Sequence, residues 1–258
     1  MDLNLAGRTA LITGGSKGIG RAAALQLAAE GCDLVLVARG AGDLDAARAA
    51  IAAKANVRVE VVAADLSIAA TVAALAARFP AIDILVNNAG AIPRGDLAEI
   101  DEARWSAAWA LKVLGYVNMC RAYYALMKAR RSGVILNVIG AAAQNRDPQY
   151  ICGVTGNAAL TAFTQALGSA SPADGVRVLG VNPGPVATGR METQLRKRAL
   201  DETGDPENWR ALVAPMPFGR AASPEEIGAA IAFLVSDRSA YTSGAILTID
   251  AGASARHA

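Results

Sequence analysis

A glycine-rich turn near the amino terminus carries the strongest chemical signal in the chain. Its residues are Thr13, Gly14, Gly15, Ser16, Lys17, Gly18, Ile19 and Gly20. They lie between an apolar run and an amphipathic stretch, so the turn should join a strand to a helix. Glycines let the backbone approach a pyrophosphate closely, and the start of the helix offers that anion unpaired N–H groups and a partial positive charge. In this context the turn predicts dinucleotide binding.

A lysine in apolar surroundings is the second candidate for chemistry. Lys112 is the only charged residue between Trp105 and Cys120, in a segment that is apolar nearly all round. A buried ammonium is costly unless it is paired or solvated, and burial lowers its pKa. Contact with the ribose of a bound nucleotide, or with a bound water, would give Lys112 a function. The alternative is that its side chain extends along the protein to reach solvent.

Other groups suited to acid–base or metal chemistry are scarce. His257 is the only histidine and the penultimate residue, so we expect neither a histidine base nor a histidine-rich metal site. Cys32, Cys120 and Cys152 lack paired spacing and therefore predict neither disulfides nor zinc. We expect each to be a small buried apolar side chain, and we predict no metal site.

Strand-like and helix-like segments alternate along the whole chain. We expect strands at 9–13, 33–38, 57–63, 82–86, 134–139, 176–181 and 245–249. We expect helices at 19–30, 42–55, 67–78, 101–131, 148–169, 191–214 and 224–235, the last opening with a capping box from Ser223 to Glu226. The alternation predicts one α/β domain over residues 1–258, a Rossmann-type doubly wound parallel sheet of about seven strands with helices on both faces.

Composition narrows the possible partners. The 258 residues are 53% hydrophobic and 19% charged, with a formal net charge of +2. This balance gives no electrostatic reason to expect binding to nucleic acid or to an anionic membrane. The longest apolar stretches are too short to span a bilayer, and the amino terminus lacks the pattern of a secretory signal. We therefore expect a cytoplasmic protein whose partner is a small-molecule substrate.

Several motifs resemble those of the short-chain dehydrogenase/reductase family. The glycine turn reads TGxxxGIG rather than the GxGxxG of other dinucleotide-binding folds. Further matches, in order and at the family's spacings, are Asp65-Leu66, Asn87-Asn88-Ala89-Gly90, Asn182-Pro183-Gly184-Pro185 with Thr188, Tyr241-Thr242-Ser243-Gly244 and Asp250-Ala251-Gly252. The resemblance therefore covers nearly the whole chain.

The resemblance implies a nicotinamide dinucleotide and the residues that would hold it. Asp65 and Leu66 would contact the adenine, and Asn88, Ala89 and Gly90 would line the ribose. Pro183, Gly184, Val186 and Thr188 would hold the nicotinamide end. These segments all follow strands, and ligands of open α/β sheets bind at the carboxyl ends of the strands.

Charge at the end of the second expected strand bears on the choice of dinucleotide. An acidic residue there would bind the 2′-hydroxyl of NAD(H), whereas this chain has Arg39, with Lys17 in the glycine turn. Two cations near that ribose favour the 2′-phosphate of NADP(H). NAD(H) remains the alternative, if both side chains are simply solvated at the surface.

The resemblance breaks down at the catalytic tetrad. The family's Asn, Ser, Tyr and Lys align with Lys112, Gly140, Gly153 and Asn157. In the family, the Tyr exchanges a proton with the substrate oxygen, the Lys lowers the pKa of the Tyr and binds ribose, the Ser positions that oxygen and the Asn holds a water. Lys112 and Asn157 look like an exchange of the family's Asn and Lys between two helices. No shift of register restores the Tyr-x-x-x-Lys motif.

Tyr150 lies one turn before Gly153 in the helix expected at 148–169. Side chains of a helix lean towards its amino terminus, so Tyr150 should point away from the usual place of the tyrosine. It could form a pocket wall or, alternatively, donate the proton. The floor of the pocket, formed by Gly140, Ala141 to Ala143 and Gly153, should be roomy.

We therefore expect an NADP(H)-binding oxidoreductase that acts on a small apolar carbonyl or alcohol by an altered proton transfer, with Lys112, Tyr150 and Asn157 as candidate catalytic residues. The alternatives are a catalytically silent cofactor-binding sensor or subunit, and non-redox chemistry of the lyase type. A lid at about 190–218 should cover the substrate, as in the family. Family members are commonly tetramers or dimers, and the apolar helix around Lys112 needs cover on more than one side, so we expect a homo-tetramer or homo-dimer.

Overall fold

The computed structural model describes residues 1–257, with side chains up to residue 255. Its strands form one parallel sheet in the order β3-β2-β1-β4-β5-β6-β7. Their bounds are β1 Thr9–Thr13, β2 Asp33–Ala38, β3 Val59–Ala63, β4 Ile84–Asn87, β5 Gly133–Val138, β6 Val176–Pro183 and β7 Ile246–Ile249. The chain begins at β1 near the centre, builds outwards to β3 and then crosses to β4. The carboxyl ends of β1 and β4 therefore flank the point where such sheets bind ligands.

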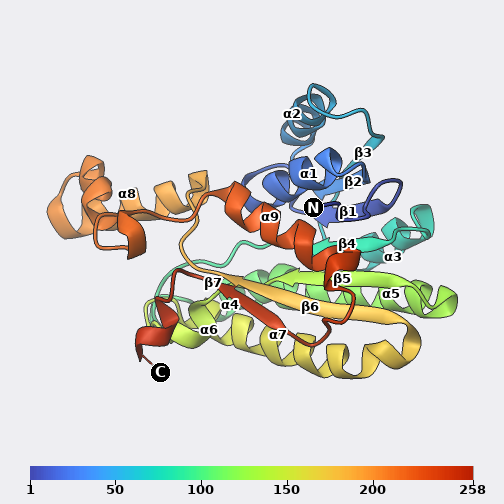
Figure 1. The fold of residues 1–258 in the computed structure, drawn as a ribbon. Helices are drawn as coiled ribbons and strands as arrows, with labels where there is room; N and C mark the ends of the chain where they lie inside the picture. The colour runs from blue at the N-terminus through green and yellow to red at the C-terminus, as the bar shows by residue number, and fades with distance from the viewer. Residues whose placement is uncertain (258) are drawn as a thin grey trace.

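Helices cover both faces of this sheet, as Figure 1 shows. Their bounds are α1 Gly18–Ala29, α2 Ala41–Ala52, α3 Ala69–Arg78, α4 Glu102–Trp109, α5 Gly115–Arg130, α6 Ala142–Asn145, α7 Ile151–Ala170, α8 Gly189–Thr203 and α9 Pro224–Val235. Helices α1, α2 and α9 share one apolar core with one side of the sheet, and α3, α5 and α7 pack on the other. The predicted fold is confirmed.

The inner strands of the sheet have continuous rather than alternating burial because both faces of the sheet are covered there. In β2, the four residues from Leu34 to Val37 are all buried, which matches the apolar run seen in the sequence. The cysteines are free and buried, as expected. Burial raises the pKa of the Cys120 thiol to about 12, so this thiol stays protonated at neutral pH.

Three helices differ from the sequence-based expectations. The helix expected at 101–131 is interrupted by one π-helical turn, Ala110–Leu114. The helix expected at 191–214 ends at Gly204, whose φ of +76° stops α8, and a 3₁₀ segment, Pro206–Leu212, follows. Helix α7 begins at Ile151 rather than at residue 148. In contrast, α9 has the predicted bounds and the predicted capping box between Ser223 and Glu226.

Helix α8 and the 3₁₀ segment after it extend away from the sheet, beyond the carboxyl ends of the strands (Figure 1). This segment corresponds to the expected lid. Among the described residues, no helix is both long and apolar enough to cross a membrane.

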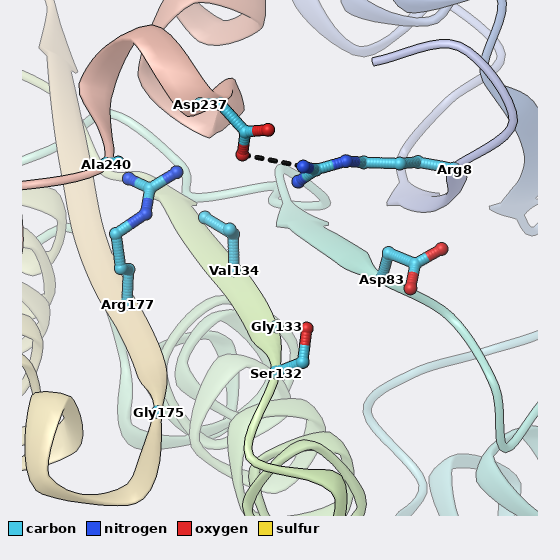
Figure 2. A pocket seen from close by; sticks show the side chains of 9 residues that line it. All are labelled: Arg8, Asp83, Ser132, Gly133, Val134, Gly175, Arg177, Asp237 and Ala240. Atoms are coloured by element: carbon cyan, nitrogen blue, oxygen red, sulfur yellow. Dashed lines mark hydrogen bonds and ion pairs between the residues drawn. The ribbon is translucent and has the colours of Figure 1, made fainter. Parts of the chain in front are cut away.

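A hollow of about 410 Å³ lies at the opposite end of the sheet, where β4, β5 and β6 begin. Figure 2 shows Arg8 paired with Asp237 above it, at 2.6 Å, and the guanidinium of Arg177 on its wall. Arg177 donates to the carbonyls of Leu234, Val235, Ser236 and Thr242, so it caps the end of α9. We interpret this hollow as structural, because ligands of such sheets bind at the other end.

Candidate active site

The glycine turn has the geometry that close approach to an anion requires. Gly14 and Gly18 have φ values of +65° and +52°, which side chains rarely adopt, and α1 begins at Gly18. A Cβ on Gly14 would lie 2.7 Å from Nδ2 of Asn88, so the turn packs directly on the segment after β4. Ser16, Ile19 and the backbone N–H groups of the turn thus lie at the place where the sequence predicts a pyrophosphate site.

Thr13 and Asn88 hold this turn in shape. The hydroxyl of Thr13 accepts from the backbone N–H groups of Asn88 at 2.8 Å and Ala89 at 3.0 Å. In return, Nδ2 of Asn88 donates to the carbonyls of Thr13 and Gly14, at 3.0 and 3.2 Å. Gly20 leaves room for these hydrogen bonds, because a Cβ there would overlap the Gly14 carbonyl. Two predicted binding residues therefore act at least as supports of the turn.

A cavity of about 360 Å³ lies where the chain leaves β2, β3 and β4, and it brings Arg39 together with Asp65 and Ser67. Oδ1 of Asp65 accepts from the backbone N–H of Ser67 at 2.9 Å and from its hydroxyl at 2.7 Å. These bonds are the main reason why the pKa of Asp65 lies below its usual value, and Arg39 adds to the effect. Leu66 is buried beside them. Of the residues predicted to bind the adenosine end, Arg39 and Asp65 thus line one cavity, together with Arg104, which sequence reasoning missed.

The two expected cations do not converge freely on this cavity. Nζ of Lys17 pairs with Oδ2 of Asp43 at 2.8 Å, whereas Arg39 makes no ion pair among the described residues. The Lys17 side chain is 72% exposed, so this pair contributes little to stability. The ion pair does offset the charge of Lys17. The expected preference for a 2′-phosphate therefore depends mainly on Arg39.

The segment from Pro183 to Thr188 is fixed at the neighbouring strand end. The N–H of Gly184 donates to the carbonyl of Ile249 at 2.9 Å, and Val186 forms an isolated bridge with Ala222. The hydroxyl of Thr188 caps α8. Its Cγ2 would lie 3.0 Å from a Cβ on Gly18, so the turn and the start of the lid meet.

Lys112 is buried at the centre of this arrangement. It lies in the π-helical turn and is only 8% exposed. Its Nζ donates to the carbonyl of Val138 at 2.7 Å and to the hydroxyl of Tyr116 at 3.0 Å. Burial lowers the pKa of Lys112 to about 7, and the positive charge of Arg190 adds to the shift. The alternative that Lys112 extends to solvent is wrong.

Tyr116 is a residue that sequence reasoning missed, although it stands four residues after Lys112. Its hydroxyl also lies 3.0 Å from the Val138 carbonyl, at the end of β5. Gly90 completes the pocket around the lysine, because a Cβ on Gly90 would lie 2.8 Å from Cδ of Lys112. The buried amine is thus held by one carbonyl, one phenol and a close backbone segment.

Gly140 and Asn157 lie together just beyond β5. Nδ2 of Asn157 donates to the Gly140 carbonyl at 3.4 Å, while its buried Oδ1 has no partner among the described residues. Gly140 has a φ of +129°, which a serine would rarely adopt. Lys112 and Asn157 therefore reach carbonyls of the same strand end, at Val138 and Gly140, without a hydrogen bond to each other.

The expected direction of Tyr150 and the expected roomy floor at Gly153 were wrong. Tyr150 precedes α7 with φ −138° and ψ 32°, so the direction rule for helical side chains does not apply to it. A Cβ on Gly153 would overlap the Tyr150 ring. The aromatic ring fills the space that the missing side chain of Gly153 leaves. Burial raises the pKa of this phenol, and Arg190 opposes that shift.

Arg190 is the third residue that sequence reasoning missed, after Arg104 and Tyr116. It stands in the first turn of α8 and donates to the carbonyls of Gly90 at 2.9 Å and Ile92 at 2.7 Å. No sequence motif marks it, because one arginine in a charged helix looks like a solvated residue.

Comparison with known proteins agrees with this geometry. A family model described as enoyl-(acyl carrier protein) reductase matches residues 14–254. This chain belongs to the short-chain dehydrogenase/reductase family. Galactitol 2-dehydrogenase (L-tagatose-forming) of Cereibacter sphaeroides is 34% identical over 251 residues, covering 96% of this chain and 95% of that protein.

Two further members of the family are similar over nearly their full length. Cis-4-hydroxycyclohexanecarboxylate dehydrogenase of Sinomonas cyclohexanicum is 37% identical over 253 residues, covering 95% of this chain and 96% of that protein. The crystal structure of L-sorbose reductase from Gluconobacter frateurii, complexed with NADPH and L-sorbose, aligns with a TM-score of 0.89 at 32% identity. That alignment covers 97% of this chain and 98% of the reductase.

Proposed function

We propose that this chain is an NADP(H)-dependent oxidoreductase that interconverts a carbonyl group and an alcohol on a small substrate, with Lys112 as the acid and base. One observation carries the proposal: the buried amine of Lys112, with a pKa of about 7, lies at the end of β5, beside the site that the family uses for chemistry. The relatives described above are oxidoreductases by name, which supports the reaction class.

The residues present fit a nicotinamide dinucleotide. The positive φ values of Gly14 and Gly18 and the cavity beside Arg39 and Asp65 are the supporting observations. When bound, the nicotinamide supplies or accepts the hydride. Arg39 favours NADP(H), and the NADPH in the L-sorbose reductase crystal agrees with that choice. NAD(H) is the alternative, because Asp43 offsets the charge of Lys17.

Lys112 can move a proton in either direction near neutral pH. With a pKa of about 7, both the ammonium and the amine are well populated there. An ammonium has three N–H donors, and the Val138 carbonyl and the Tyr116 hydroxyl take two of them. The third N–H is left for a substrate oxygen or a water. A positioned acid of this kind contributes roughly 10²–10⁴-fold to a rate.

Asn157 has a supporting function in this proposal. Its Oδ1 is a buried acceptor without a partner among the described residues, and such an atom normally receives a hydrogen bond. A water or a ribose hydroxyl would satisfy it. Asn157 would thereby replace the ribose contact that the family makes with lysine, while Lys112 takes over the proton.

The test combines a binding measurement with a turnover measurement. NADPH fluorescence should shift on titration with protein, at lower concentrations than for NADH. A panel of small ketones should be reduced, and Lys112→Met should lower turnover at least tenfold while NADPH still binds. Lys128→Met is the matched control, because Lys128 is an exposed lysine on the following helix, α5, and its replacement should leave turnover unchanged.

Each failure of this test has a distinct meaning. NADPH binding without turnover of any ketone would replace the proposal with a silent cofactor-binding protein. Unchanged turnover in Lys112→Met would remove Lys112 as the acid.

A homo-oligomeric assembly and a cytoplasmic location stay predictions. Leu114, 55% exposed in the π-helical turn, is a surface that a second copy could cover. Light scattering on the purified protein measures the assembly.

A further inference from the structure

We infer that the pocket takes an anionic substrate, a small keto or hydroxy acid whose carboxylate pairs with Arg190. The inference rests on the proposed function and narrows its substrate class. The pairing of the charged side chains in the lid is the first observation that supports it.

Arg190 joins the lid to the wall of the pocket. Its two terminal nitrogens donate to the Gly90 and Ile92 carbonyls, on the segment that follows β4. That segment packs directly against the buried lysine, since a Cβ on Gly90 would lie 2.8 Å from Cδ of Lys112. Arg190 is an exposed residue, but these two hydrogen bonds fix its guanidinium next to the segment that packs on Lys112.

The other arginines of the lid are neutralised. Arg196 pairs with Glu192 at 2.9 Å and also with Glu207, to which Arg210 is paired as well. Arg198 pairs with Glu202 at 2.6 Å. In the described part of the chain, Arg190 pairs with no carboxylate, and its recorded partners are the neutral backbone carbonyls of Gly90 and Ile92 and the Tyr150 phenol.

The neighbouring groups do not supply the missing negative charge. The recorded partners of Lys112 are a carbonyl and a phenol. Asp147 precedes Tyr150 by three residues, and it pairs with Arg94 at 2.7 Å while also accepting from the N–H of Gln149. Within the described residues, Arg190 thus stands without a counter-ion close to Lys112, whose pKa of about 7 leaves it only partly protonated at neutral pH.

A carboxylate fits this arrangement better than a neutral polyol. The guanidinium has five N–H donors; backbone carbonyls take two of them and the Tyr150 phenol takes one, so others remain for a planar acceptor. Hydrogen bonds between an arginine and a carboxylate are charge-assisted and roughly twice as strong as neutral ones. The adjacent wall is apolar, with Ile92, Trp109 and Tyr150 in one cluster. These features select a compact apolar body that carries one negative charge.

The test measures binding rather than turnover. The NADP⁺-saturated protein is titrated by calorimetry with levulinate and with 4-oxocyclohexanecarboxylate, each beside its methyl ester. The ester keeps the ketone and the body of the acid and removes only the charge. We expect at least one of the two acids to bind at least tenfold more tightly than its ester.

Two variants locate the source of this preference. Arg190→Gln should abolish the preference, because it weakens binding of the acid and leaves binding of the ester unchanged. Arg190→Lys should retain part of the preference. Arg198→Gln is the matched control on the same helix and should keep the full preference. Equal binding of acid and ester to the native protein would overturn the inference, as would a preference that survives Arg190→Gln. If Arg190→Gln reduced the affinities for acid and ester equally, the inference would also be overturned, because Arg190 would then only hold the lid.

This result is independent of the test of the proposed function. If NADPH binds and neutral ketones turn over, but the acids show no preference, only the inference fails. If the acids bind preferentially and no carbonyl is ever reduced, the proposed reaction fails and the anion site stands.

Discussion

The phenol ring of Tyr150 occupies the space that a side chain on Gly153 would need. A Cβ on Gly153 would lie 2.7 Å from Cδ1 of Tyr150 and would overlap Cε1 and Cζ. Tyr150 reaches this place because it precedes α7 and does not follow helical geometry. The ring of Tyr150 can therefore occupy this place only because residue 153 is glycine.

Gly153→Ala should displace the Tyr150 ring and destabilise the protein by about 1–3 kcal/mol, as is usual for overpacking. Turnover should fall as well, because the ring forms part of the pocket wall. Gly42→Ala is the control: Gly42 is also helical, a Cβ there meets nothing within 4 Å, and alanine favours helix. Thermal unfolding of both variants measures the difference. Equal stability changes would mean that Tyr150 moves aside without cost.

The rate of carbonyl reduction should fall as the pH rises through about 7, because only the ammonium form of Lys112 can donate a proton. Alcohol oxidation needs the amine, so its rate should rise through the same pH. Rates measured from pH 5 to pH 9 in both directions test this. Profiles without an inflection near pH 7 would assign proton transfer to another group.

The stability of the native protein should rise relative to Lys112→Met as the pH increases from about 7 towards 10.5. The folded state depresses the pKa of Lys112, so in this range the unfolded chain binds more protons than the folded one. The stabilising difference is fully present above the unfolded pKa and is lost as the pH falls to the folded one. Urea unfolding at several pH values measures it. A difference that does not vary with pH would show that Lys112 keeps an ordinary pKa.

Asp43→Asn should tighten NADPH binding several-fold and leave NADH binding nearly unchanged. The substitution releases Lys17 from its ion pair, so that its charge can act on a 2′-phosphate. Fluorescence titration with both nucleotides gives the two affinities. Asp45→Asn, on the same helix but paired with Arg48, is the control and should change neither. Equal tightening of both nucleotides would place the effect away from the 2′-phosphate.

Arg177→Met should destabilise the protein by roughly 3 kcal/mol without changing NADPH affinity. The variant leaves the carbonyls at the end of α9 without their donor, and buried acceptors without a partner are costly. Unfolding and fluorescence titration of one sample measure both effects. A stable variant with weakened NADPH binding would contradict the structural interpretation of the hollow in Figure 2.

The fold was largely predictable because each strand is an apolar run and each connection a helix. The bounds of β1, β2 and α9 match the expectations fully, since glycines, polar ends and a capping box mark them in the sequence. The burial of Lys112 was also foreseeable as one of two possibilities, because no other charge lies on its segment.

The finer features of the site depend on backbone detail that residue spacing does not encode. The expected helix start at residue 148 gave Tyr150 the wrong direction, and only the observed start at Ile151 corrects it. The pairing of Lys17 with Asp43, and the absence of such a partner for Arg190 in the described chain, depend on which surface side chains meet in space. The donation from Lys112 to Tyr116 could have been suspected from their spacing of four residues, one helical turn.

The backbone at Gly140 also constrains how this protein can change over evolutionary time. Its φ of +129° penalises any replacement by serine, and Nδ2 of Asn157 would lie 2.9 Å from the added Cβ. A tyrosine at position 153 would meet the ring of Tyr150 in the same way. Either substitution alone is thus expected to be harmful, so the backbone at Gly140 and the ring of Tyr150 restrict which side chains these two positions can accept.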